Sequence, residues 1–206
     1  MLNEKQIKCL LISSLGKKYQ ARLIGVEVPF LSGKRWADVL LITKKGELIA
    51  FEIKSDYDSL RRMSRQLEDY TRTFNQVYVI LSGKFRNSEA LRSLPKAVGY
   101  AFIDSRKKPI EFARQAKSRK RLSKSNLLFF LWRKDLLICR RGKKDSVEQL
   151  RTRMGRACSL TGIQKKAVNA LTERYEGRYR TFLREKSDRI QEEDLNYLTK
   201  TFWGSF

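Results

Sequence analysis

Two nearly continuous apolar runs, residues 36–42 and 48–53, dominate the hydropathy pattern of the first half of the chain. Runs of this kind are typical of strands that are covered on both faces. Lys44-Lys45-Gly46 between them has the length of a common hairpin loop, and its final glycine accepts the positive φ that such a loop requires. The pattern therefore predicts an antiparallel hairpin inside a buried sheet.

Helical and extended patterns alternate around this hairpin. Apolar residues recur at helical spacing near the N-terminus and after the hairpin, and short apolar runs bounded by turn residues follow. The predicted elements, in chain order, are a helix after Asn3, a strand at 19–30, the hairpin, a helix at 60–74 and strands at 76–81 and 97–103. This order predicts an α/β fold with a central sheet flanked by helices.

Charged residues stand within or at the end of the two apolar runs. If Thr43 faces Glu47 across the hairpin, counting back along both strands places Asp38 directly opposite Glu52. Lys54 follows two residues later and shares the face of Glu52. Because buried carboxylates are usually paired or bound to metal, this face could hold Mg²⁺ or Mn²⁺ through two acids, with a lysine beside them. A structural ion pair to Lys54 at the rim of the sheet is the alternative.

These residues carry a family resemblance. Asp38, followed by Glu52-x-Lys54 on the next strand, resembles the signature of the PD-(D/E)XK nuclease superfamily. On the following helix, Gln66-Leu67-Glu68-Asp69-Tyr70 has the Gln-x-x-x-Tyr spacing of its RecB-like members. Ala37 stands where the superfamily's name has proline, a position that performs no chemistry.

The resemblance covers residues 1–105 and is closest to small bacterial and phage proteins of mostly unassigned role. It implies a restriction-endonuclease-like core, with a mixed central sheet flanked by helices. It also implies metal-dependent hydrolysis of phosphodiester bonds, with DNA favoured over RNA as the substrate.

Roles for individual residues follow from the same resemblance. Asp38, Glu52 and the backbone carbonyl of Ile53 would hold one or two Mg²⁺ or Mn²⁺ ions, and Glu4 on the first helix would reach the same metal. The plainer interpretation of Glu4 is a carboxylate in the first turn of a helix, where the helix dipole favours it.

The remaining roles concern the substrate. Lys54 would orient the attacking water or stabilise the developing oxyanion, and Gln66 and Tyr70 would help to hold the scissile strand. The predicted catalytic residues are Asp38, Glu52, Lys54, Gln66 and Tyr70. For Tyr70, core packing on one face of its helix is the plainer alternative.

Composition excludes several other chemistries. The chain has no histidine, so Ser-His-Asp hydrolysis, zincins and Cys-His nucleophile pairs are excluded. Its three cysteines, Cys9, Cys139 and Cys158, are too few for a four-cysteine iron–sulfur cluster, and no such cluster is expected. Unpatterned cysteines and the lack of an apolar run of about 20 residues predict a cytoplasmic protein with no membrane partner.

The charge points to a polyanionic partner. Lysine and arginine number 45 against 22 aspartate and glutamate, a net charge of +23, and nucleic acid is the first candidate. Residues 106–206 carry 27 basic and 11 acidic residues, whereas residues 1–105 carry 18 and 11. The candidate nucleic-acid contacts are Arg35, Arg62, Arg65, Lys117, Arg119, Lys120 and Arg121.

This distribution predicts three parts: a PD-(D/E)XK nuclease-like core at 1–105, a basic linker or surface helix at 106–124, and a helical basic region at 125–206. The last part would bind nucleic acid or brace the core, and Leu160-Thr161-Gly162 resembles the elbow of a helix–turn–helix. Two other functions stay open: a nucleic-acid-binding module with an idle nuclease site, and a subunit active only within a protein complex. A homodimer or a protein partner is also left open.

Overall fold

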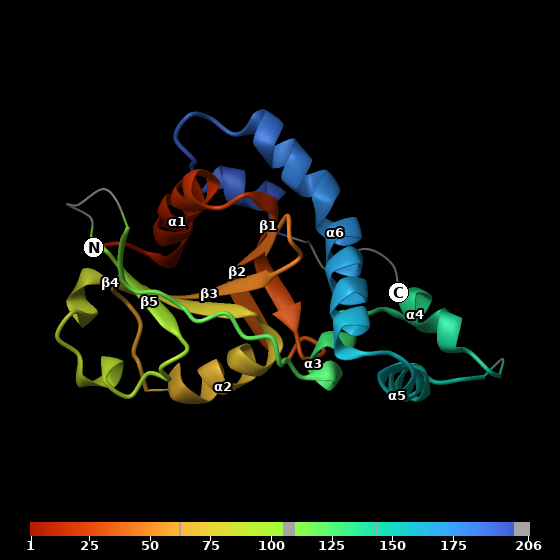
Figure 1. Cartoon of the computed structure of the whole chain (residues 1–206). Coiled ribbons are helices and arrows are strands. Elements are labelled where there is room, and N and C mark those ends of the chain that lie inside the picture. Colours follow the sequence, from red (N-terminus) through yellow and green to blue (C-terminus); the bar gives the residue numbers. More distant parts are fainter. Residues whose placement is uncertain (62, 105–109, 143, 200–206) are drawn as a thin grey trace.

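The computed structural model describes residues 1–61, 63–104, 110–142 and 144–199 (Figure 1). These residues form a six-stranded sheet in the order β1-β2-β3-β4-β5-β6. The strands are β1 (Ala21–Phe30), β2 (Arg35–Thr43), β3 (Leu48–Lys54), β4 (Gln76–Ser82), β5 (Gly99–Ile103) and β6 (Glu111–Arg114). Strands β3, β4 and β5 are parallel, and the other neighbours are antiparallel. The predicted α/β class and the mixed central sheet are therefore confirmed.

Helices cover both faces of this sheet (Figure 1). Helix α1 (Glu4–Lys18) lies on one face and α2 (Met63–Thr73) on the other, while α6 (Leu160–Glu185) passes the edge strand β1. The shorter helices are α3 (Lys124–Leu128), α4 (Arg133–Leu136) and α5 (Val147–Ala157), with 3-10 turns η1 (Gly83–Phe85), η2 (Glu89–Leu91), η3 (Leu137–Cys139) and η4 (Glu193–Tyr197). No described helix combines the length and the apolar composition that a bilayer span requires.

The predicted hairpin forms between β2 and β3. The Thr43 amide donates to the Glu47 carbonyl oxygen over 3.0 Å, and Gly46 takes a φ of +80°. Paired residues run from Ile42 opposite Leu48 to Val39 opposite Phe51, and every residue of β3 is buried. Continuing this register by one pair brings Asp38 opposite Glu52, as the sequence predicts.

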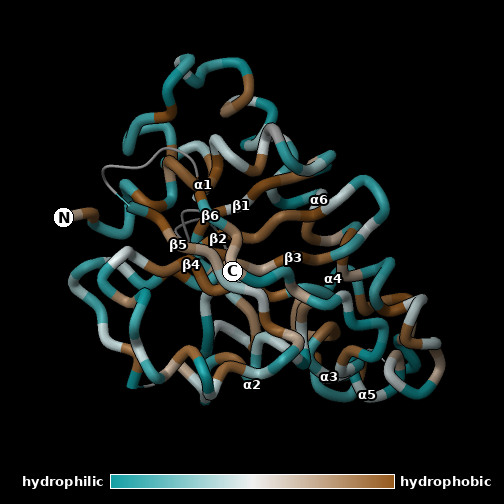
Figure 2. The backbone as a smooth tube through the Cα atoms, turned by 60° about the vertical axis from the view of Figure 1, so that its left-hand side comes forward, coloured by the Kyte–Doolittle hydropathy of each residue, from teal (hydrophilic) through white to brown (hydrophobic). Residues whose placement is uncertain are grey.

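One hydrophobic core joins the N-terminal and C-terminal halves of the chain. The strands form its apolar centre, and the polar stretches lie mainly in the outer loops (Figure 2). The Phe74 ring, at the end of α2, lies 6.1 Å from the ring of Phe130, which follows α3. Tyr175 and Phe182 of α6 are buried in the same cluster. The C-terminal helices therefore complete the core that the sheet begins.

Residues 106–124 differ from the predicted linker or surface helix. Residues 105–109 lie outside the described part, Glu111–Arg114 forms β6, and the segment 115–123 is extended, with a helix beginning only at Lys124. The reason is that acceptors on other elements take its backbone donors: the Arg119 amide donates to the Asn75 carbonyl (2.8 Å) and the Ser123 amide to the Arg72 carbonyl (2.8 Å). The helix alternative is wrong for this segment, and the sheet continues beyond residue 105.

The predicted elbow at Leu160-Thr161-Gly162 is the first turn of α6. The chain bends two residues earlier, at Cys158 and Ser159, because Ser159 is the N-cap of α6 and its hydroxyl accepts from the Gly162 amide over 3.1 Å. Serine is a preferred N-cap residue, so Ser159 marks the start of α6 more strongly than the glycine three residues later marks a bend.

Candidate active site

Asp38, Glu52 and Lys54 lie together where β3 ends. The Lys54 ammonium donates to Glu52 Oε1 over 2.7 Å, and Asp38 Oδ2 accepts from the Ile53 amide over 2.6 Å. Glu52 and Lys54 are only 4% and 9% exposed. The hairpin register and the two-residue periodicity of β3 thus bring the three predicted side chains to one end of the sheet.

Helix α2 supplies the other two predicted residues. Gln66 Oε1 accepts from Lys54 Nζ over 3.2 Å, and the Tyr70 hydroxyl lies 2.5 Å from Glu52 Oε2 and 2.6 Å from the Trp36 carbonyl oxygen. A hydroxyl has one proton to donate, so it serves these two acceptors one at a time. Lys54, Glu52, Gln66 and Tyr70 consequently form one connected network, and Asp38 lies opposite Glu52.

Tyr70 packs in the core and also contacts the carboxylate cluster, while its role in holding the scissile strand stays a prediction. Its ring packs edge-on against Phe30 at a centroid distance of 4.9 Å and lies 5.6 Å from Phe74, so it belongs to the core. Its hydroxyl reaches past the core to Glu52. Burial raises the pKa of Tyr70 well above its usual range, and the charges of Glu52 and Asp38 add to this. The hydroxyl therefore stays protonated and acts as a donor.

The electrostatics of Asp38 reflect two acids in close proximity. Burial raises the pKa of Asp38 well above its usual range, and the charges of Glu52 and Glu4 raise it further. The hydrogen bond from the Ile53 amide and the charge of Lys8 act in the opposite direction but do not offset it. The charged form of Asp38 is therefore disfavoured here unless a cation comes close.

Lys8 is a site residue that sequence reasoning missed. Its ammonium pairs with Glu4 Oε1 at 2.6 Å and with Glu27 Oε1 at 3.0 Å, and the residue is 1% exposed. Burial lowers the pKa of Lys8, but the hydrogen bond and charge of Glu4, with Asp38 and Glu27, outweigh it and raise the pKa overall. The available signal was the four-residue spacing from Glu4 on one helix face.

Glu27 reaches this cluster through an unusual backbone. Its neighbours pair as Val26 with Val39 and Val28 with Ala37, so Glu27 lies level with Asp38 on the adjacent strand. Its φ of +50° is in the left-handed region, which costs a non-glycine residue about 1 kcal/mol. Glu27, Asp38 and Glu52 consequently stand at one level of three adjacent strands, with Lys8 held between Glu4 and Glu27.

The donor set fits a hard divalent cation in part. In the described residues no group of three or more carboxylate or thiolate side chains is arranged to hold a metal ion. Mg²⁺ often binds through one or two carboxylates and keeps several waters, so Asp38 and Glu52 would suffice as its side-chain ligands. A shared cation would also relieve the repulsion that raises the pKa of Asp38. Glu4 has its carboxylate on Lys8, so its role as a ligand stays a prediction.

The predicted nucleic-acid contacts divide between the two ends of the sheet. Arg35, at the start of β2, pairs with Asp69 over 2.9 Å, and Arg65 is exposed one residue before Gln66, so both lie at the end that holds the carboxylates. Arg62 lies outside the described residues. The contacts predicted between Lys117 and Arg121 lie at the opposite end, because Arg119 bonds to Asn75, and Asn75 bonds to Leu48 at the start of β3.

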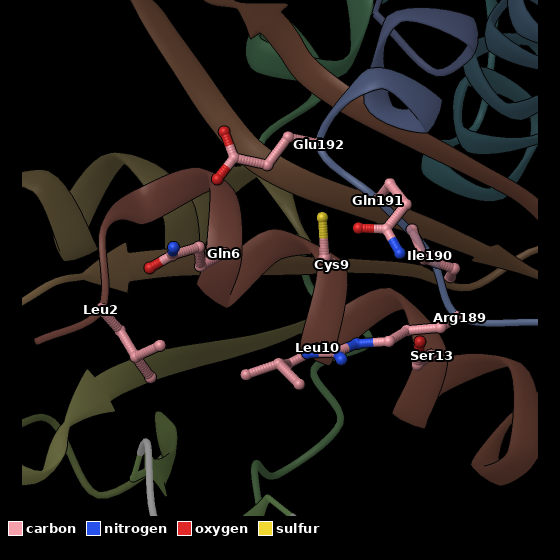
Figure 3. Close-up of a pocket in the computed structure, with 9 residues that line it drawn as sticks. All are labelled: Leu2, Gln6, Cys9, Leu10, Ser13, Arg189, Ile190, Gln191 and Glu192. Carbon is pink, nitrogen blue, oxygen red and sulfur yellow. The ribbon is translucent and has the colours of Figure 1, made fainter.

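A pocket of about 250 Å³ lies elsewhere, between α1 and the segment before η4 (Figure 3). None of the five predicted catalytic residues lines it; its lining consists of Leu2, Gln6, Cys9, Leu10, Ser13, Arg189, Ile190, Gln191 and Glu192. Burial, with the charges of Glu192 and its neighbours, raises the pKa of the Cys9 thiol to about 11. The thiol therefore stays protonated at neutral pH and is a poor nucleophile.

Comparisons with known proteins find similarity to phage proteins. The family model described as bacteriophage P4 protein cII matches residues 1–199. Protein cII of Enterobacteria phage P4 is 30% identical over 197 residues, which cover 89% of this chain and 72% of that protein. Among solved structures, the SPO1766 protein of unknown function from Silicibacter pomeroyi aligns with a TM-score of 0.45 and 19% identity, over 59% of this chain and 77% of that one.

Proposed function

This chain belongs to the bacteriophage P4 protein cII family, and we propose that it is a metal-dependent nuclease of the PD-(D/E)XK type. In this proposal the sheet with α1 and α2 is a restriction-endonuclease-like core of the RecB-like branch. The substrate is nucleic acid, with DNA favoured over RNA, and the reaction is hydrolysis of a phosphodiester bond.

One observation carries the proposal: Lys54 bridges Glu52 and Gln66, while Asp38 accepts from the Ile53 amide directly after Glu52. A lysine needed only to neutralise Glu52 would have no use for Gln66, and a carboxylate needed only for folding would not be set beside a second one. The raised pKa of Asp38 means that this pairing opposes folding, which is common at functional sites and unusual elsewhere.

Each residue has a role that its contacts support. Asp38 and Glu52, with the Ile53 carbonyl, would hold Mg²⁺ or Mn²⁺, which when bound supplies a Lewis acid and lowers the pKa of its water. Tyr70 fixes the orientation of Glu52 through Oε2. Gln66 holds the Lys54 ammonium, whose charge can orient a water or stabilise an anionic phosphoryl oxygen.

A second function has an observation in its favour. Both carboxylate oxygens of Glu52 already accept hydrogen bonds, from Lys54 and from Tyr70. A metal ion bound by Glu52 would have to share at least one of these oxygens with a hydrogen-bond donor. This arrangement favours a nucleic-acid-binding module whose nuclease site is idle.

The test is an assay of cleavage by the purified chain. Linear, circular and single-stranded DNA and RNA are each incubated with Mg²⁺, Mn²⁺ or EDTA, and the products are resolved on denaturing gels. We expect wild type to cleave DNA with either metal and not in EDTA, and Glu52→Gln and Lys54→Ala to lose at least about a hundredfold in rate.

The matched control is Glu68→Gln, which makes the same chemical change on the exposed side of α2 and should keep full activity. Salt-sensitive binding without cleavage by wild type in every metal would support the idle-site function. Cleavage that appears only after addition of a cell extract would indicate a subunit that works within a complex.

A further inference from the structure

A basic surface lies at the opposite end of the sheet from the candidate active site. Its main part is the extended segment 115–123, in which residues 117–121 are all exposed. This segment belongs to a stretch, residues 112–134, that contains eight basic residues and no acid. It passes from β6 to α3 across one end of the sheet (Figure 1).

Hydrogen bonds bring two further segments beside it. The Ser118 hydroxyl donates to Glu47 Oε1 over 3.0 Å, and the Gln164 side chain of α6 donates to the Gly46 carbonyl over 3.3 Å. The β2–β3 hairpin and the first turns of α6 therefore adjoin the extended segment. The resulting distal basic surface consists of Lys44, Lys45, Lys117, Arg119, Lys120, Arg121 and Lys165, all exposed.

Within the described part of the chain, none of the seven members of this surface takes part in an ion pair. Glu47, the acid nearby, accepts from Ser118. Lys124 differs, because its ammonium donates to the carbonyls of Gly155 (3.2 Å) and Cys158 (2.8 Å) at the end of α5 and so has a structural role.

The distance between the two sites follows from the sheet. Lys54 ends β3, whereas the distal surface adjoins Leu48 at its start through Asn75. Six residue steps of about 3.3 Å separate the two sites by roughly 20 Å. A double helix rises about 3.4 Å per base pair, so this distance corresponds to about six base pairs.

We propose that the distal basic surface is an anchoring site for the phosphate backbone of nucleic acid, separate from the carboxylate cluster. A substrate must then extend over at least about six base pairs to occupy both sites. The spacing rests on the proposed nuclease function, whereas the binding itself does not. Membrane-binding surfaces combine basic with apolar side chains. Among the described residues, no exposed large hydrophobic side chain lies at 43–47, 115–123 or 160–166, so a phosphate backbone is the better partner.

The experiment measures binding by fluorescence anisotropy in EDTA, with every variant built on Glu52→Gln so that cleavage cannot interfere. The probes are a 24-base-pair duplex and a DNA hairpin with a four-base-pair stem. The test variant is Arg119→Ala/Lys120→Ala/Arg121→Ala. Its matched control, Arg180→Ala/Arg184→Ala/Lys186→Ala, removes the same charge near the end of α6.

We expect the test variant to bind the long duplex at least about tenfold more weakly. The slope of log K against log[salt] should become less negative by about 2 to 3. The short hairpin occupies one site at a time and can still use the other, so its affinity should fall by less than that of the long duplex, and the control should match its parent on both probes. Lys44→Ala/Lys45→Ala, which leaves the extended segment intact, should lose affinity in the same direction.

Unchanged binding of the long duplex by both distal variants would overturn the proposal. An equal loss on both probes would overturn the two-site spacing. Binding of phosphatidylserine vesicles in place of DNA, lost in the same variants, would assign the surface to a membrane instead. Failure of the nuclease proposal would look different, because wild type would not cleave while the long duplex was still held through the distal surface.

Discussion

One side chain at the candidate site, that of Tyr70, contacts both the hydrophobic core and the carboxylate cluster. Tyr70 has its ring in the core against Phe30 and its hydroxyl on Glu52. Helical periodicity predicts the buried ring, whereas the resemblance implied by the Gln-x-x-x-Tyr spacing predicts that Tyr70 helps to hold the scissile strand. The contact between the hydroxyl and Glu52 was not predicted, because a sequence pattern does not show what each end of one side chain touches.

Removal of the Tyr70 hydroxyl alone tests whether its hydrogen bond to Glu52 contributes to cleavage. Tyr70→Phe keeps the ring contacts but leaves Glu52 Oε2 without its donor, so we expect the free energy of unfolding to fall by about 2 kcal/mol. The cleavage rate should fall at least about tenfold, because Glu52 loses its fixed orientation. Urea unfolding and the gel assay measure the two effects. Tyr57→Phe, on an exposed ring, is the control and should alter neither.

Asp38 should make the metal-free protein less stable at neutral pH. Its pKa in the folded chain is raised by burial and by Glu52, so the folded state holds this proton more tightly than the unfolded state. Stability is therefore lost as pH rises from the unfolded pKa to the folded one, and the loss persists above it. In EDTA at pH 8, Asp38→Asn should raise Tm by several degrees.

The difference should shrink as pH falls below the usual aspartate pKa of about 3.9, where both states are protonated. Mn²⁺ should raise the Tm of wild type and leave that of Asp38→Asn unchanged. Differential scanning fluorimetry records all of these transitions, with the exposed Asp188→Asn as a neutral reference. A lower Tm for Asp38→Asn in EDTA at pH 8 would refute the electrostatic account.

At the scale of elements, local signals gave correct predictions and long-range ones were missed. The β2–β3 hairpin follows from two apolar runs and one glycine, so its register, and with it the opposition of Asp38 and Glu52, could be counted from the sequence. The path of residues 115–123 is set by acceptors on Asn75 and Arg72, far away in sequence. Lys8 was missed although Glu4 lies four residues before it, because its second partner, Glu27, is on another element and has a left-handed backbone.

The Asn75 side chain links β3, α6 and the extended segment beside the distal basic surface. It is 5% exposed; its Oδ1 accepts from the Leu48 amide (2.9 Å) and Gln164 (3.1 Å), and its Nδ2 donates to the Arg119 carbonyl (2.9 Å). Asn75→Ala would leave these buried groups unsatisfied, so we expect a loss of about 3 kcal/mol in urea unfolding.

Amide hydrogen exchange should also become faster at Leu48 and Arg119 in this variant. The Leu48 amide loses its acceptor, and Arg119 loses the hydrogen bond that holds its carbonyl group in place. Asn87→Ala, at an exposed asparagine, should behave as wild type. A stable Asn75→Ala protein with unchanged exchange would mean that the backbone contacts alone hold the extended segment.

At the scale of the whole molecule, the helical C-terminal region is tied to the sheet by a shared core. Phe130 contacts Phe74, Tyr175 of α6 packs near Gly25 of β1, and the Val26 amide donates to the Leu198 carbonyl over 3.0 Å. The sequence predicted a boundary near residue 105 because charge density rises there, but charge describes the surface and says little of what is buried beneath it.

The shared core predicts one cooperative unfolding transition for the full chain and none for a fragment of residues 1–124. That fragment would expose the apolar faces of β1 and α2 that Tyr175 and Phe130 cover, and each lost aromatic contact of this size costs about 3 to 5 kcal/mol, comparable to a large part of a domain's stability. Circular dichroism during urea titration, with limited proteolysis, compares the two chains. A fragment that unfolds cooperatively and cleaves DNA would instead make residues 125–206 a separable appendage, and the distal basic surface would then work without the Lys165 contribution of α6.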